Sequence, residues 1–92
     1  LRLDELLKEV VADARVLAGM RAQKIQLDEL AGVAVRGDQD RLYQLFFNIL
    51  GNAVKYTPKG GKIWVSLRLA GSFALVEIRD NGPGIPLGDQ PH

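Results

Sequence analysis

The sequence has no cysteine, a single histidine and no long run of apolar residues. Without cysteine there are no disulfide bonds and no thiolate metal sites, which fits a reducing compartment. No stretch approaches the roughly 20 consecutive apolar residues that a membrane-spanning helix needs, and the amino terminus lacks the character of a signal peptide. The formal net charge of +1 leaves no basic surface for nucleic acid. We therefore expect neither a nucleic-acid partner nor a membrane anchor within this sequence.

The composition fits one small globular unit. The chain has 92 residues, of which 47% are hydrophobic and 25% are charged, so it is long enough for a modest core. Its one histidine, His92, closes a polar tail and is interpreted as a bystander rather than a catalytic group. Its one tryptophan, Trp64, is interpreted as packing on a sheet rather than as a partner contact.

Apolar residues recur at helical spacing in two places. The first pattern predicts a helix that has Asp4 as its N-cap and ends near Met20, after a short strand at residues 1–3. The second predicts a helix that is capped by Asp38 and ends at Thr57, because the proline that follows disfavours helical geometry. We expect one stripe of this second helix to pack on a sheet: Leu42, Leu45, Phe46, Ile49, Leu50 and Ala53.

Alternating apolar residues predict strands at residues 24–27, 33–35, 62–69 and 73–80. The last of these strands ends at Asp80, which has the parity of the apolar face. A carboxylate delivered there is costly to bury unless it meets a hydrogen-bond donor. The next residues include glycines, which let a backbone approach a ligand closely.

A second stripe on the predicted central helix is polar and consists of Asn48, Asn52, Lys55 and Tyr56. Asparagine is a mediocre helix former, so two asparagines one turn apart inside a helix suggest a role other than helix stability. One interpretation is an ordinary solvent-facing surface. The other is a site where two amide oxygens, an ammonium group and a ring converge on a polyphosphate, its metal ion and a base. The glycine-flanked Asp80 favours the second interpretation.

Two segments resemble motifs of a known family. Residues 48–58, NILGNAVKYTP, resemble the N box, and residues 80–85, DNGPGI, resemble the G1 box, of the ATP-binding domain of sensor histidine kinases. This domain belongs to the wider superfamily of DNA gyrase, Hsp90 and MutL, and residues 37–42 have its usual lead-in. The resemblance implies an α+β fold: a two-layer α/β sandwich with helices on one face of a mixed sheet. We expect an incomplete Bergerat-type domain over residues 1–86 and a loose tail over residues 87–92.

The resemblance also implies a role for each site residue. Asn52 would coordinate Mg²⁺ through its amide oxygen, and Asn48 would support the phosphates or a metal-bound water. Lys55 would offset phosphate charge, and Tyr56 would pack beside the adenine or ribose. Asp80 would accept a hydrogen bond from the adenine amino group. The remaining members of the implied ATP site are Gly82, Gly84 and Ile85.

The implied cofactors are ATP and Mg²⁺, and the implied activity is phosphoryl transfer. Hydrolysing relatives carry a glutamate one turn before the metal-binding asparagine, whereas Asn48 has an amide that cannot act as a general base. A histidine on a separate dimerisation domain would then accept the γ-phosphoryl group, and a response regulator would receive it later. Such a domain is cytoplasmic, with the parent kinase anchored in the inner membrane in receptors.

The family pattern continues beyond the G1 box with an ATP lid and a second glycine motif, and its phosphoacceptor histidine lies on another domain. We therefore expect this chain alone not to phosphorylate itself, and we expect an unpaired sheet edge that favours self-association. A non-catalytic interaction or dimerisation module of the same fold is an alternative function. A serine kinase of the anti-sigma type is a second alternative.

Overall fold

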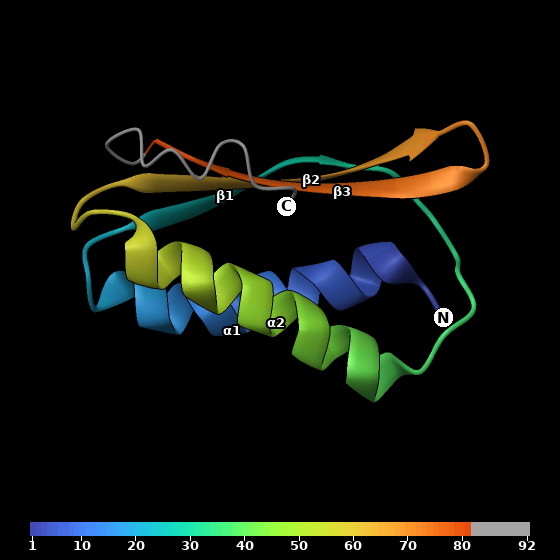
Figure 1. Cartoon of the computed structure of the whole chain (residues 1–92), viewed down its shortest axis with the longest axis horizontal. Coiled ribbons are helices and arrows are strands. Elements are labelled where there is room, and N and C mark those ends of the chain that lie inside the picture. The colour runs from blue at the N-terminus through green and yellow to red at the C-terminus, as the bar shows by residue number, and fades with distance from the viewer. Residues whose placement is uncertain (82–92) are drawn as a thin grey trace.

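The computed structural model describes residues 1–81 of the chain. Both helices of this part lie on one face of its sheet, which gives the two layers visible in Figure 1. In chain order the elements are α1 (Leu3–Gly19), β1 (Lys24–Leu30), α2 (Gln39–Tyr56), β2 (Lys62–Ala70) and β3 (Phe73–Asp80). The predicted α+β sandwich is confirmed. The predicted boundary at residue 86 lies outside the described residues.

The sheet is mixed, as expected, because its central strand β2 pairs parallel with β1 and antiparallel with β3. The β1–β2 register shifts between Leu27 and Leu30. An irregularity of this kind interrupts the alternation of side chains along a strand. The sequence pattern therefore stopped at residue 27, although the strand continues to Leu30.

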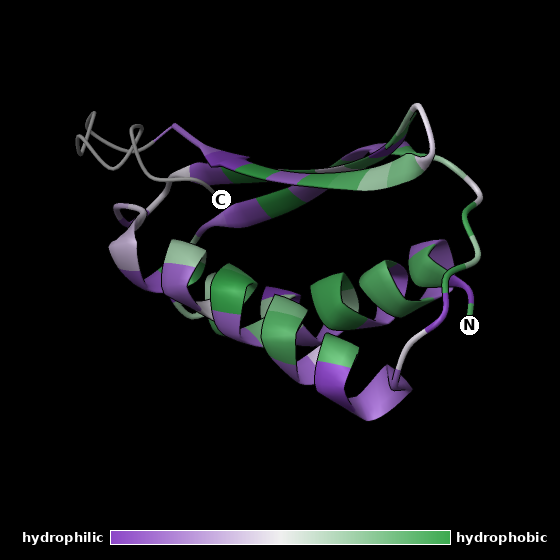
Figure 2. Cartoon of the chain, turned by 45° about the vertical axis from the view of Figure 1, so that its right-hand side comes forward, coloured by the Kyte–Doolittle hydropathy of each residue, from purple (hydrophilic) through white to green (hydrophobic). Residues whose placement is uncertain are grey.

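The core lies between the two layers, where the apolar sides of the helices meet the inner face of β2 (Figure 2). Ile63, Val65 and Leu67 of β2 are each at most 1% exposed, and Val11 of α1 is fully buried. Burying such a side chain stabilises a fold by about 1.5–3 kcal/mol relative to leaving it exposed. Neither helix within residues 1–81 has the length and apolarity required to cross a bilayer.

Most of the predicted apolar stripe of α2 does face the core: Leu50 is buried, and Leu42, Phe46 and Ala53 pack against buried residues. Two positions differ from the prediction, because Leu45 is 50% exposed and Val54, outside the stripe, is buried. The difference arises because α1 packs beside α2: the Tyr43 hydroxyl donates a hydrogen bond to Asp13 of α1, which raises the pKa of Tyr43 to about 12. Tyr43 also stacks on Phe47, with ring centres 5.8 Å apart.

The start of α1 corrects the prediction that Asp4 is the N-cap. The N-cap is Arg2, whose carbonyl oxygen accepts the first helical hydrogen bond from the Leu6 amide at 3.1 Å. The helix begins early because the Leu3 amide donates to the Val33 carbonyl at 2.8 Å. Asp4 instead lies inside the first turn and pairs with the Arg2 guanidinium through two contacts of 3.1 Å.

The strands predicted at residues 1–3 and 33–35 form only one isolated bridge, between Arg2 and Ala34. Leu1 and Val35 exchange backbone hydrogen bonds of 2.8 Å beside that bridge. The pairing cannot continue because α1 starts at Leu3. The prediction of strands there was wrong, although the two segments do lie side by side.

The Arg2–Asp4 pair predicts a pH dependence of stability. Hydrogen bonding to Arg2 lowers the pKa of Asp4 from 3.8 to about 2. A carboxyl group with a depressed pKa stabilises the folded chain above its ordinary pKa, and this stabilisation is lost as pH falls through the folded value. In urea titrations, Asp4→Asn should therefore be less stable than wild type near neutral pH, and the difference should disappear as pH falls toward 2. Arg2→Met should behave in the same way, and a difference independent of pH would contradict the assignment.

The turn that follows α1 contains a strained residue. Ala22 has a φ of +54°, the left-handed region that favours glycine. Its amide donates to Gly19, and the next amide, of Gln23, donates to Ala18 at 2.9 Å, which closes the helix end. The chain reverses into β1 through this turn.

Ala22→Gly should raise the free energy of unfolding by about 0.5–1 kcal/mol, because relief of left-handed strain exceeds the added freedom of the unfolded chain. The same substitution at Ala12, on the exposed face of α1, should lower it by about 1 kcal/mol. Urea denaturation of both variants measures the two signs. A loss of stability in Ala22→Gly would mean that the turn is not strained in solution.

Candidate nucleotide-binding site

The C-terminal half of α2 carries four of the predicted site residues on its exposed surface. Asn48 and Asn52 are one helical turn apart, and neither is buried. The Lys55 ammonium lies 5.6 Å from the centre of the Tyr56 ring, a cation–π contact, and Tyr56 is 52% exposed. The helix therefore presents an amide pair, a cation and an aromatic ring in sequence along its last turns.

Asp80 lies at the end of β3, opposite Ile63 in the antiparallel register. Paired residues of antiparallel strands point to the same face of the sheet, and Ile63 is a core residue. Asp80 therefore lies on the helix-covered face, at its exposed rim. This agrees with the parity that the sequence predicts for Asp80.

Gly61 marks the point where the end of α2 meets the end of β3. A Cβ atom at Gly61 would lie 2.5 Å from Cγ2 of Thr57 and 3.1 Å from Oδ1 of Asn81. Thr57 is the C-cap of α2, and Asn81 follows Asp80 directly. The Asn81 side chain accepts a hydrogen bond of 2.7 Å from the Lys62 amide, and its own amide donates to the Lys62 carbonyl at 3.1 Å. The end of β3 is thus hydrogen-bonded to Lys62, next to the glycine that both Thr57 and Asn81 approach.

Sequence reasoning missed two further residues at this place, Arg21 and Gln23. The Gln23 side-chain amide donates to the carbonyl oxygens of Val54 at 2.9 Å and Thr57 at 2.7 Å, and Gln23 is only 6% exposed. The Arg21 guanidinium donates to Thr57 at 3.1 Å. One signal was present in the sequence: Gln23 has the same parity as Ile25, a core residue of β1, so a buried amide was foreseeable there.

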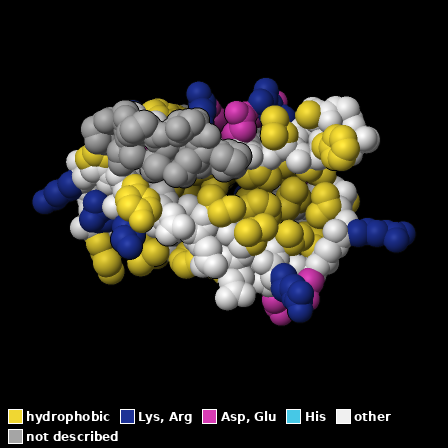
Figure 3. Space-filling view, in the orientation of Figure 1, with side chains coloured by type: hydrophobic (Ala, Val, Ile, Leu, Met, Phe, Trp, Pro, Cys, Tyr) yellow, Lys and Arg dark blue, Asp and Glu magenta, His cyan; other side chains and the backbone are white. Residues whose placement is uncertain are grey.

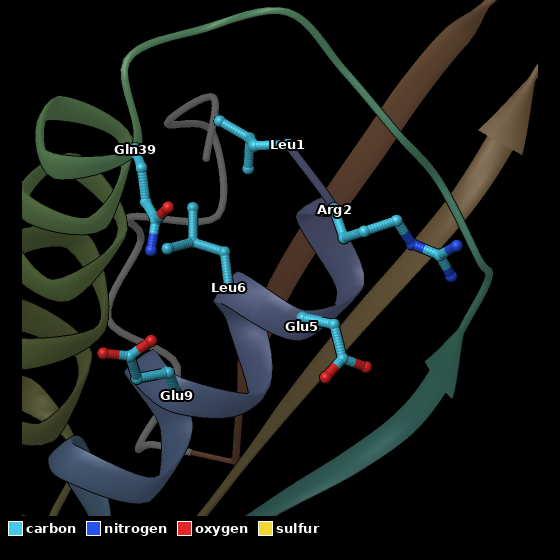
Figure 4. A pocket seen from close by; sticks show the side chains of 6 residues that line it. All are labelled: Leu1, Arg2, Glu5, Leu6, Glu9 and Gln39. Atoms are coloured by element: carbon cyan, nitrogen blue, oxygen red, sulfur yellow. The ribbon is translucent and has the colours of Figure 1, made fainter.

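A pocket of about 500 Å³ lies at the other end of the helices, where α1 and α2 begin (Figure 4). It is lined by Leu1, Arg2, Glu5, Leu6, Glu9 and Gln39. None of the predicted site residues that the structure describes, Asn48, Asn52, Lys55, Tyr56 and Asp80, lines it. Two of its members are acidic, which is unfavourable for a polyphosphate.

The oxygen donors available for a metal ion are amides rather than a carboxylate cage. No group of three or more His, Cys, Asp or Glu side chains within residues 1–81 is placed to hold a metal. Mg²⁺ is usually bound through a few protein oxygens together with phosphates and water, so the paired amides of Asn48 and Asn52 fit an ion that arrives with a nucleotide. The predicted site members Gly82, Gly84 and Ile85 lie outside the described residues.

A two-layer α/β domain with a polar helix end joined to a carboxylate-bearing strand end defines a candidate nucleotide-binding domain. The sequence profile of the family described as "Histidine kinase-, DNA gyrase B-, and HSP90-like ATPase" matches residues 37–92. The chain belongs to this family. ATP is the ligand that the family name implies.

Sensor kinases are among its relatives. The adaptive-response sensory kinase SasA of Thermosynechococcus vestitus is 40% identical over 98% of this chain, which corresponds to 24% of that kinase. Sporulation kinase C of Bacillus subtilis is 31% identical over 92% of this chain and 20% of that kinase. The chain thus spans a quarter or less of the length of these relatives.

Solved structures of histidine kinases share the fold. The mycobacterial sensor histidine kinase MprB superposes with a TM-score of 0.81 at 27% identity, covering 96% of this chain and 58% of that one. The catalytic domain of histidine kinase ThkA superposes with a TM-score of 0.78 at 25% identity, covering 94% of this chain and 60% of that one. The arrangement of helices and sheet is therefore that of histidine kinase catalytic domains.

Gly61→Ala should lower the free energy of unfolding by about 1–3 kcal/mol, because an overpacked site forces its neighbours to move. The contact is severe because Thr57 is fully buried and the third neighbour, the Pro58 carbonyl oxygen at 3.0 Å, belongs to the backbone. The matched control is Gly51→Ala in α2, where a Cβ would meet nothing within 4 Å. That variant should gain about 0.5–1 kcal/mol from helix propensity. Equal effects in the two variants would contradict close packing at Gly61.

Proposed function

We propose that the chain is the ATP-binding part of a two-component sensor histidine kinase and that its site is formed by the end of α2 and the end of β3. The observation that carries this proposal is the junction at Gly61, where Thr57 and Asn81 approach the same point. Thr57 follows Lys55 and Tyr56, and Asn81 follows Asp80, so the junction supports a site between the polar end of α2 and the strand end that carries the carboxylate. Membership of the ATPase family supports ATP as the ligand.

Each side chain has a role that suits its chemistry. Asn52 would supply an amide oxygen to Mg²⁺, and Asn48, one turn earlier, would hold the phosphates or a metal-bound water. Lys55 would offset phosphate charge, and the exposed Tyr56 ring would pack against adenine or ribose. Asp80 would accept a hydrogen bond from the adenine amino group. Guanine carries an oxygen at that position, so Asp80 would select adenine.

The reaction of the whole kinase would be transfer of the γ-phosphoryl group to a histidine on a separate dimerisation domain. The imidazole nitrogen of that histidine would attack the γ-phosphorus, the bond from this phosphorus to the bridging oxygen would break, and ADP would leave. The Asn48 amide provides no general base for water, which favours transfer over hydrolysis. A response regulator would then receive the phosphoryl group, on the cytoplasmic side where ATP is available.

This proposal is tested by isothermal titration calorimetry, in which ATP is added to the 92-residue chain with and without Mg²⁺. We expect binding that requires Mg²⁺, and we expect Asn52→Ala and Asp80→Asn each to weaken it about tenfold or more, the range for losing one well-placed polar contact. Asp80→Asn should also reduce the preference for ATP over GTP, because the carboxylate is the adenine-specific acceptor.

Two matched variants control for non-specific effects. Gln44→Ala changes an exposed polar residue on α2, and Asp28→Asn removes a carboxylate from the outer face of the sheet. Both should bind ATP as wild type does. ATP binding that is unaffected by Asn52→Ala and by Asp80→Asn would remove the site assignment.

An interaction module of the same fold is the second candidate function. Apolar side chains remain visible between α2 and the sheet (Figure 3), and Leu45, Leu69 and Phe73 are 50%, 60% and 75% exposed. Within residues 1–81 no strand pairs with the outer edge of β3. Such a surface suits a second copy of the chain. Concentration-dependent sedimentation without any ATP binding would favour this function over the first.

A further inference from the structure

The buried amide of Gln23 holds the end of the helix that carries the predicted site. Its nitrogen lies 2.9 Å from the Val54 carbonyl oxygen, 2.7 Å from the Thr57 oxygen and 3.5 Å from the Pro58 oxygen. The last carbonyl groups of a helix lack partners within the helix and carry its negative partial charge. The Gln23 side-chain amide donates to two of these carbonyl groups, so it supplies their missing hydrogen-bond partner and sets the positive end of an N–H dipole against their negative partial charge.

Gln23 is itself fixed by the end of the other helix. Its backbone amide donates to the Ala18 carbonyl at 2.9 Å, which closes α1, and the residue is only 6% exposed. The neighbouring backbone extends the contact: the Gly60 amide donates to the Arg21 carbonyl at 3.0 Å, and the Lys24 amide donates to the Gly61 carbonyl at 3.1 Å. The turn between α1 and β1 is therefore joined to the turn between α2 and β2.

Arg21 contributes less than Gln23 to the contact between these two turns. Its guanidinium donates to Thr57 at 3.1 Å and more distantly to Lys55 at 3.5 Å, and its side chain lies at an exposed position. Hydrogen bonds are stronger where water is excluded, and an unpaired buried carbonyl is costly. The buried amide of Gln23 is thus the contact on which the helix end depends.

The carbonyl groups that Gln23 holds flank the two residues of interest. Val54 precedes Lys55 and Tyr56, and Thr57 follows them. Because the backbone is held on both sides of Lys55 and Tyr56, their two side chains leave the helix in fixed directions. Without this constraint the final turn of a helix frays readily, because its last carbonyls have no intrahelical partner.

We infer that Gln23 is a positioning residue for nucleotide binding, which acts by fixing the direction of Lys55 and Tyr56. It touches no nucleotide group in this scheme and acts through the backbone of α2. The inference rests on the proposed function, since it assigns to Lys55 and Tyr56 the contacts with phosphate and base.

The first test is Gln23→Leu, which keeps the volume and removes the donors. We expect affinity for Mg-ATP to fall about tenfold, the effect of misplacing one or two polar contacts. Gln23→Asn retains the amide but shortens its reach by one methylene, and it should fall between wild type and Gln23→Leu. This milder variant decides the question if Gln23→Leu does not fold.

A stability control separates positioning from general destabilisation. Val33→Ala removes core volume beside the start of α1, where Val33 packs with Leu3, Leu6, Leu7 and Leu67, away from the end of α2. At a temperature where this variant and the Gln23 variants are all folded by circular dichroism, Val33→Ala should bind Mg-ATP as wild type does. A loss of affinity in Val33→Ala equal to that of Gln23→Leu would overturn the positioning role.

Two further readouts address the route of the effect. If Gln23 acts through Lys55, then Gln23→Leu should cost less than about threefold in a Lys55→Ala background, because residues that act as a unit are not additive. Full additivity would overturn this route. In the nucleotide-free chain, Gln23→Leu should shift the NMR amide signals of Lys55 and Tyr56 but not that of Asn48, and unchanged signals would overturn the inference independently of binding.

Failure of the inference and failure of the proposed function give different results. A wild-type chain that binds no Mg-ATP contradicts the proposed function and, with it, the role of Gln23 in nucleotide binding. A wild-type chain that binds Mg-ATP, together with a Gln23→Leu variant of equal affinity, contradicts the inference alone.

Discussion

The pairing of β2 with a parallel neighbour on one edge and an antiparallel neighbour on the other is the constraint on which the molecule depends. Neighbouring parallel strands start at the same end of a sheet, and an antiparallel neighbour finishes at that end. Lys24 at the start of β1 therefore lies beside Lys62 at the start of β2, and Asp80 at the end of β3 lies beside Ile63. One end of the sheet therefore brings together the turn before β1, the turn before β2 and the end of β3. The candidate site lies at this end.

Helix α2 has one face that packs in the core and another that carries candidate site residues. Leu50 and Val54 face the sheet and are almost fully buried, while Asn48 and Asn52 remain exposed. Hydrophobic burial fixes the position of the helix, and it makes no demand on the polar residues of the exposed surface. The direction of the last turn is a separate matter, because Lys55 and Tyr56 are exposed and the carbonyl groups on either side of them accept hydrogen bonds from Gln23.

Local patterns predicted most of the fold, and their failures have a common cause. The Asp38 cap was predicted correctly because a cap depends on neighbours two or three residues away. Asp4 looked like a cap of the same kind, but the Leu3 amide bonds to Val33, thirty residues distant, and the helix starts earlier. On α2 the exposure of Leu45 and the burial of Val54 were missed for the same reason, since α1 also packs against this helix.

The order of residues was enough to establish the family, the element types and the residues proposed to meet the nucleotide, because motifs, caps and alternation are written within short windows of chain. The three-dimensional arrangement was needed to see that Gly61 has room for no side chain and that Gln23 closes the end of a helix thirty residues away. Both depend on contacts between distant segments, and a distant contact exists only once the core has brought its two partners to the same edge of the sheet.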